Sequence, residues 1–195
     1  MTFLDFINEY DKPGYIVLLE GKREVAASDQ KILTELGIML ASFTKFMLFR
    51  SGNAAGADHY FSEGVFHVAP DRLQVITPYI SHRNKTNPEY ASIPLDNVDL
   101  MAEPEVVYQS KQNKKTANLI DKYVAGARDR FSIKAAYIIR DTVKAIGTTD
   151  IPPAKFGIFY DDLSNPMQGG TGHTMDVCKK NDIPVINQTV WLHWL

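Results

Sequence analysis

The sequence has few of the features that mark secreted, membrane-spanning or metal-binding proteins. Its one cysteine, Cys178, excludes an internal disulfide and a cysteine-based metal site. No run of about 18 apolar residues is present to span a bilayer. The first residues carry an acid and no basic region of a secretory signal. Four of the five histidines, His59, His67, His82 and His193, lack metal-ligand spacing with acids or cysteines. We therefore expect a cytoplasmic protein with no membrane partner, no metal site and no cofactor.

A strong net charge is also missing. The 21 basic and 23 acidic side chains leave a formal charge of -2 at pH 7. Nonspecific affinity for nucleic acid comes from many phosphate contacts made by Lys and Arg. Nucleic acid is therefore not expected as a partner, although a local basic patch stays open. The cluster Lys111, Lys114 and Lys115 is interpreted as the solvated start of a helix.

The pattern of the chain predicts one domain, residues 1–195. Apolar runs typical of buried strands occur at 15–19, 46–49, 73–77, 156–160 and 183–186, and they alternate with helical patterns at 28–42, 113–124 and 131–146. A polar, proline-containing stretch at 81–104 is predicted to be a long loop. Without hairpin signals, this order predicts an α/β fold, a Rossmann-like three-layer α/β/α sandwich with a mostly parallel sheet. The dinucleotide fingerprint G-x-G-x-x-G is absent, which argues against an ordinary NAD dehydrogenase.

A glycine cluster, Q-G-G-T-G-H-T at 168–174, follows a predicted strand and opens a predicted helix. Exposed N–H groups at the positive end of a helix suit an anion such as phosphate. A second small-residue turn, S-G-N-A-A-G-A-D at 51–58, follows another strand, and Gly21-Lys22-Arg23 follows the first. Open α/β sheets bind ligands at the carboxyl ends of their strands. The clusters predict a phosphorylated ligand, with tight turns as the alternative reading.

Two polar side chains in these segments have two readings each. Asp58 either braces the turn amides or contacts a ligand hydroxyl. His173 either hydrogen-bonds a phosphate or acts as an acid or base near neutrality, or else it caps the helix or braces the loop. The residues alone leave both alternatives open.

Taken together, the three segments resemble the SLOG superfamily, which includes the Smf/DprA DNA-processing proteins and the Lonely Guy phosphoribohydrolases. The resemblance covers about residues 15–187. It implies a Rossmann-like fold, a homodimer, and a pocket at the strand ends for a nucleotide-derived small molecule. The ligand-binding residues that it implies are Gly21, Lys22, Arg23, Ser51, Gly52, Asn53, Gly56, Asp58, Arg128, Arg130, Gly169, Gly170, Thr171, Gly172, His173 and Thr174.

The enzyme question depends on one carboxylate. Lonely Guy enzymes carry P-G-G-x-G-T-x-x-E, and Asp176 falls where this glutamate stands, while His173 replaces the threonine. Aspartate shortens the reach by roughly 1.5 Å, and such a misplacement costs about a hundredfold in rate. The sequence therefore favours a nucleotide sensor or sequestering module. The first alternative is a nucleoside-monophosphate N-glycosidic hydrolase with Asp176 as the catalytic residue, and the second is a DprA-like single-stranded DNA-binding protein.

Overall fold

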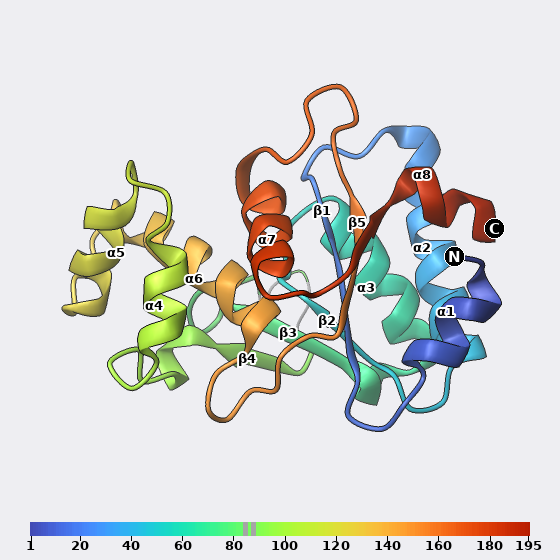
Figure 1. Cartoon of the computed structure of the whole chain (residues 1–195), viewed down its shortest axis with the longest axis horizontal. Helices are drawn as coiled ribbons and strands as arrows, with labels where there is room; N and C mark the ends of the chain where they lie inside the picture. Colours follow the sequence, from blue (N-terminus) through green and yellow to red (C-terminus); the bar gives the residue numbers. More distant parts are fainter. Residues whose placement is uncertain (84–85, 87–88) are drawn as a thin grey trace.

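The computed structural model describes residues 1–83, 86 and 89–195, and in them six strands form one all-parallel sheet (Figure 1). Along the sheet the order is β4-β3-β2-β1-β5-β6. The strands are β1 (Ile16–Gly21), β2 (Leu48–Ser51), β3 (Leu73–Thr77), β4 (Ser92–Pro94), β5 (Phe156–Tyr160) and β6 (Val185–Asn187). The order reverses between β1 and β5, so the topological switch point of this α/β sheet lies between those two strands.

Helices cover both faces of the sheet, which confirms the Rossmann-like three-layer α/β/α prediction. One face carries α1 (Phe3–Tyr10), α2 (Ala27–Phe43), α3 (Ala57–Val68) and α8 (Gln188–Trp191). The other face carries α6 (Ser132–Ile146) and α7 (Gly169–Lys180), and α4 (Pro104–Ser110) and α5 (Ala117–Val124) pack on α6 (Figure 1). Successive residues of β1 serve opposite layers, since Val17 and Leu19 pack with α2 and α3 while Leu18 packs with α7.

Several boundaries differ from the sequence prediction. Strand β1 continues through Glu20 and Gly21, which were expected in a loop, because both still pair with β5. Strand β2 begins at Leu48, two residues later than expected. The carboxylate of Asp11 accepts the backbone N–H groups of residues 45–47 at 2.7 to 2.9 Å. These residues therefore turn around Asp11 before the strand begins.

The stretch predicted as a long loop, 81–104, holds regular structure. Residues Ser92–Pro94 form the edge strand β4, paired in parallel with β3. Helix α4 follows it and was not predicted. Residues 84–85 and 87–88 of the predicted loop lie outside the described residues.

The two ends of the chain pack on each other. Trp191 is 1% exposed, and its indole N–H donates to the carbonyl of Phe159 at 2.9 Å. Trp194 stacks on Phe6 and contacts Phe3, both in α1. The tryptophans are therefore engaged within the chain, and the homodimer stays a prediction. No helix among the described residues has the length and apolar character to cross a membrane.

The start of α2 is tied to β5. The helix begins at Ala27, one residue before the predicted helical stretch 28–42, and it has no side-chain cap. The carboxylate of Asp29 accepts from the hydroxyl of Tyr160 at 2.6 Å and from that of Ser28 at 2.7 Å. A contact distant in sequence therefore fixes this end of the helix.

Candidate functional site

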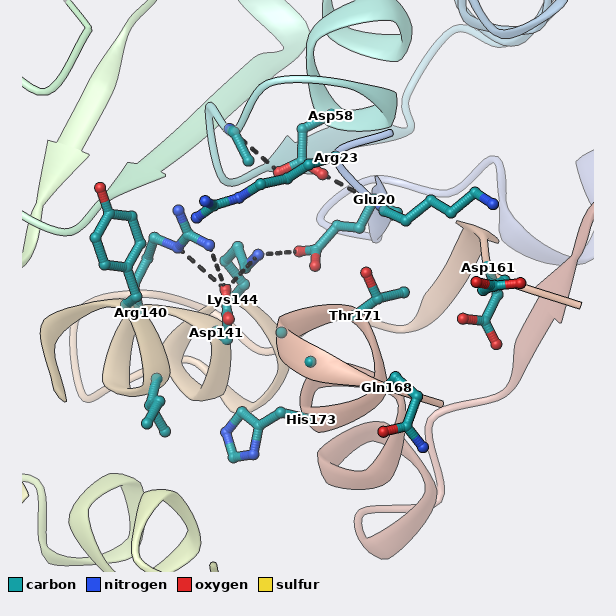
Figure 2. A pocket seen from close by; sticks show the side chains of 18 of the residues that line it. Glu20, Arg23, Asp58, Arg140, Asp141, Lys144, Asp161, Gln168, Thr171 and His173 are labelled. Carbon is teal, nitrogen blue, oxygen red and sulfur yellow. Dashed lines mark hydrogen bonds and ion pairs between the residues drawn. The ribbon is translucent and has the colours of Figure 1, made fainter. Parts of the chain in front are cut away.

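A cavity of about 720 Å³ opens at the carboxyl edge of the sheet, at the switch point between β1 and β5. Its walls come from the end of β1 and the segment after it (residues 20–24), from α6, from the first turn of α7, and from Asp161 and Asp162 after β5. Figure 2 shows the side chains of Glu20, Arg140, Asp141 and Lys144 meeting on one side of the cavity, with Asp161 apart from them. Its volume lies within the range of about 300 to 1,000 Å³ typical of small-molecule sites.

Half of the predicted ligand-binding residues line this cavity. They are Gly21, Lys22, Arg23, Asp58, Gly169, Gly170, Thr171 and His173. Others do not line it, namely Ser51, Gly52, Asn53, Gly56, Gly172 and Thr174. Gly52 lies directly behind the wall, because a Cβ there would approach the Lys144 ammonium to 2.8 Å.

The first turn of α7 points open backbone groups at the cavity. Its N-cap, Gln168, makes no side-chain cap hydrogen bond, and within the described chain the N–H groups of Gly169, Gly170 and Thr171 have no acceptor. Unpaired N–H groups at a helix start carry partial positive charge and attract anions. At Gly170 an added Cβ would lie 3.0 Å from Asp141 Oδ2. The absence of a side chain therefore keeps this end of the helix open.

Buried charges form the floor of the cavity, and the sequence reasoning missed them. The Lys144 ammonium lies 2.7 Å from Glu20 Oε1 and 2.8 Å from Asp141 Oδ1, while Arg140 lies 2.6 Å from the same Asp141 oxygen (Figure 2). All four side chains are at most 6% exposed. The available signals were the three charges Arg140, Asp141 and Lys144 close together in the second half of an amphipathic helix, and a glutamate at the end of an apolar strand.

The carboxyl group of Glu20 has a pKa close to neutral pH. Burial raises the pKa of its carboxyl to about 7, and the carboxylates of Asp58 and Asp141 act in the same direction, while the Lys144 ammonium opposes them. For Asp141, burial raises the pKa, but Arg140 and Lys144 outweigh it and the pKa is lowered. Among these side chains, Glu20 is therefore the one that exchanges a proton near pH 7.

A third buried cation, Arg50, lies behind Glu20. Arg50 in β2 is 0% exposed, and burial lowers the pKa of its guanidinium to about 10, with the Glu20 charge acting against this. It donates to the carbonyls of Lys144 and Pro152 at 3.0 and 2.8 Å and to the amide oxygen of Gln74. Arg50 therefore joins β2 to the end of α6.

The hydrogen bonds of Asp58 brace two turns. One carboxylate oxygen accepts from the N–H of Gly21 at 3.2 Å, and the other accepts from Gly52 at 3.3 Å and Ala54 at 3.4 Å. These bonds fix the segment after β1 against the segment after β2. Of the two readings of Asp58, loop bracing accounts for its contacts.

His173 lies between α7 and α6. Its Nε2 is 3.0 Å from the Thr142 hydroxyl, and burial lowers the pKa of the imidazole, although the Asp141 and Asp176 charges oppose this. The ring is therefore neutral near pH 7, which makes it a hydrogen-bonding group and not a permanent positive charge for phosphate.

Three other predicted site residues lie outside the cavity. Asp176 pairs with Lys180 at 2.7 Å and is about half exposed on the flank of α7. Arg128 and Arg130 lie between α5 and α6, with their guanidinium groups 4.0 and 4.7 Å from the rings of Tyr123 and Phe131. The carboxylate proposed for glycosidic hydrolysis, Asp176, thus does not line the 720 Å³ cavity, which we call the main cavity. Within the described chain, no three His, Cys, Asp or Glu side chains gather as a metal site.

One aromatic ring completes the lining. Tyr137 of α6 has the guanidinium groups of Arg23 and Arg140 at 5.8 and 5.2 Å from its ring centre. Its hydroxyl lies 3.2 Å from His82 Nε2. The cavity therefore offers a π surface beside its charged floor.

Comparison with known proteins identifies the fold class. No family model matches the chain, and no curated protein matches its sequence. A structure of DNA processing protein A from Helicobacter pylori, described by its unique single-stranded DNA binding mode, superposes with a TM-score of 0.53 at 14% identity, over 92% of this chain and 67% of that one. DprA from Streptococcus pneumoniae gives a TM-score of 0.47 at 13% identity, over 95% of this chain and 52% of that one. The first likeness shows a shared Rossmann-like fold.

The exclusion of nucleic acid as a partner is corrected by this comparison. The exclusion came from the net charge of -2, which is a sum over the whole chain. The H. pylori protein shares the fold and binds single-stranded DNA. Net charge does not report how charges are distributed over the surface, so it was the wrong criterion.

Proposed function

We propose that this protein binds single-stranded DNA and that the main cavity holds one nucleotide unit, with its phosphate at the first turn of α7. The observation that carries this proposal is the open start of α7, whose unpaired N–H groups face a nucleotide-sized cavity at the switch point of the sheet. Lys22 and Arg23 border the same space. The proposed phosphate ligands are the N–H groups of Gly169, Gly170 and Thr171.

Charge distribution supports a chain-like ligand. Residues 111–134 hold seven Lys and Arg against two Asp, a local charge of +5 in a chain of net charge -2. Asn113, Thr116 and Lys134 of this segment line the cavity. A basic surface therefore continues from the cavity along α5 and the start of α6, as tracking of a phosphodiester backbone requires.

The comparisons add independent support. The H. pylori protein carries the same fold over 92% of this chain and binds single-stranded DNA. We extend the proposal to membership of the SLOG superfamily, on the glycine motifs and the fold together. At 14% identity this extension is a proposal about ancestry, and the binding proposal does not depend on it.

A free nucleotide-derived molecule is the second candidate ligand. It is favoured by the depth of the main cavity, whose floor of Glu20, Asp141 and Lys144 is almost fully buried. A buried floor suits a compact ligand that enters whole. Both candidates share a nucleoside phosphate, and they differ in whether the polymer binds more tightly than its monomer.

Fluorescence anisotropy with a labelled single-stranded oligonucleotide tests the proposal. We expect saturable binding that weakens as salt rises, weaker binding of duplex, and competition by unlabelled single strands. Tighter competition by a mononucleotide would favour the second candidate. Absence of binding to both would contradict the proposal.

Two substitutions locate the ligand. Gly170→Val places a side chain at the open helix end and should abolish binding, while a thermal melt shows the fold intact. Lys134→Glu at the rim should weaken binding about tenfold. Lys155→Glu makes the same charge change at the amino-terminal edge of the sheet, beside the start of β1, and should have a smaller effect. Equal effects of the two lysine variants would place the ligand elsewhere.

A further inference from the structure

A second cavity of about 420 Å³ lies on the flank of α7, beside the main one. We call it the flank cavity. It shares four lining residues with the main cavity, namely Asn113, Gln168, Gly169 and His173. The other residues come from α7, from Met167 just before it, and from Gln112 in the segment after α4. The two spaces therefore meet around the first turn of α7.

Polar groups line the boundary between the two cavities. The side chains of Asn113 and Gln168 are exposed there, and His173 is partly buried with its Nε2 held 3.0 Å from the Thr142 hydroxyl. Amide and imidazole groups donate and accept hydrogen bonds. A ligand that extends from the main cavity into the flank cavity thus passes hydrogen-bonding groups and no apolar barrier.

The flank cavity has a nearly balanced charge of its own. Asp176 and Lys180 line it and pair with each other at 2.7 Å, each side chain about half exposed. The chain that forms its opposite wall runs from Asn113 directly into the exposed Lys114 and Lys115. A phosphodiester leaving the flank cavity would therefore meet basic side chains.

We propose that the flank cavity is a second nucleotide subsite, which takes the next unit of a phosphodiester chain whose first unit occupies the main cavity. This inference rests on the proposed binding function and adds where two successive nucleotide units lie on the protein. The phosphate between the two units passes the open turn at Gly169, and Lys180 faces the second unit. Asp176, considered from the sequence as a catalytic group, lies in this subsite as an acid that limits affinity.

Competition with short thymidine ligands tests the subsite. Thymidine 5′-monophosphate and the dinucleotide pTpT compete against a labelled oligonucleotide on the full chain. We expect pTpT to bind at least about tenfold more tightly than the monophosphate, because the second unit adds contacts without a second association cost. Equal affinities for the two ligands would overturn the subsite and leave the proposed function standing. Failure of both ligands and of the oligonucleotide would overturn both proposals.

Paired variants on α7 locate the second unit. Lys180→Glu should weaken pTpT about tenfold and leave the monophosphate within about twofold. Lys179→Glu makes the same change on the neighbouring residue, which lines a different cavity, and should weaken pTpT less. Asp176→Asn should strengthen pTpT. Equal losses for Lys179→Glu and Lys180→Glu, or loss of monophosphate binding in Lys180→Glu, would contradict the assignment.

Discussion

The proposed DNA binding should depend on pH through Glu20. Its carboxylate lies on the cavity floor, where the pKa is raised to about 7 by burial and by the neighbouring carboxylates. Ionised Glu20 would repel a phosphate bound at the start of α7 as we propose. Two unit charges roughly 8 Å apart, at an effective dielectric constant of about 20, interact by on the order of 2 kcal/mol, or about thirtyfold in affinity. Binding should therefore weaken as pH rises through about 7.

The substitution Glu20→Gln removes this charge and keeps the shape of the side chain. We expect the variant to bind a single-stranded oligonucleotide about thirtyfold more tightly than the wild type at pH 8, with no difference at pH 5.5, where wild-type Glu20 is protonated. Phosphodiesters do not titrate in this range, so anisotropy at constant ionic strength isolates the protein group. In the variant Lys144 keeps its ion pair with Asp141 at 2.8 Å.

Protein stability offers a second readout of the same group. The folded state binds more protons at Glu20 than the unfolded state between pH 4.5 and about 7, so the free energy of unfolding should fall as pH rises through that window. The loss is on the order of 3 kcal/mol and should disappear in Glu20→Gln. Glu9→Gln, an exposed glutamate in α1, is the matched control. Wild-type binding that is flat from pH 5.5 to 8, with Glu20→Gln unchanged, would refute the reasoning.

Three further predictions concern the scaffold, each measured by urea denaturation. Arg50→Met should destabilise the fold by about 2 to 4 kcal/mol, because it strands the carbonyls of Lys144 and Pro152; a change below about 0.5 kcal/mol would count against it. Trp191→Phe should cost about 1 to 3 kcal/mol, since the carbonyl of Phe159 loses its donor; a wild-type midpoint would contradict this. For Asp11, burial raises the pKa, but three backbone N–H groups lower it overall. Its stabilisation should be present above pH 3.8 and lost as pH falls through the lower folded value. Asp11→Ala should remove that acid-dependent loss, and a pH profile like the wild type's would sink the assignment.

The fold was predictable from the sequence because its strands are buried on both faces. Apolar runs at 73–77 and 156–160 gave β3 and β5 with correct bounds. The edge strand β4 was missed because Ser92–Pro94 is partly exposed and ends in proline, so it carries no apolar run. The start of β2 was misplaced because Asp11, distant in the chain, binds the amides of the apolar residues before it.

The candidate site was predictable only in its backbone. The glycine cluster predicted the start of α7, because small residues at the beginning of a helix form a local sequence motif. The charged floor joins Glu20 of β1 to Lys144 of α6, two residues that lie far apart in the sequence. The pairing of β1 with β5 and the packing of α6 on the sheet bring these two side chains together. No local sequence pattern reports such a contact between distant segments. Arg128 and Arg130 were predicted as ligands because they precede the last glycine motif in the chain. In the structure they lie outside the cavity, beside the rings of Tyr123 and Phe131.

Backbone amide NMR during titration with a single-stranded oligonucleotide tests the central claim most directly. We expect the amide signals of Gly169, Gly170 and Thr171 to shift first and furthest, together with those of Gly21 to Arg23 across the cavity. Signals of α1 and of the amino-terminal edge of the sheet should stay in place. Shifts confined to α1 and α2, or a spectrum unchanged at saturating oligonucleotide, would contradict it.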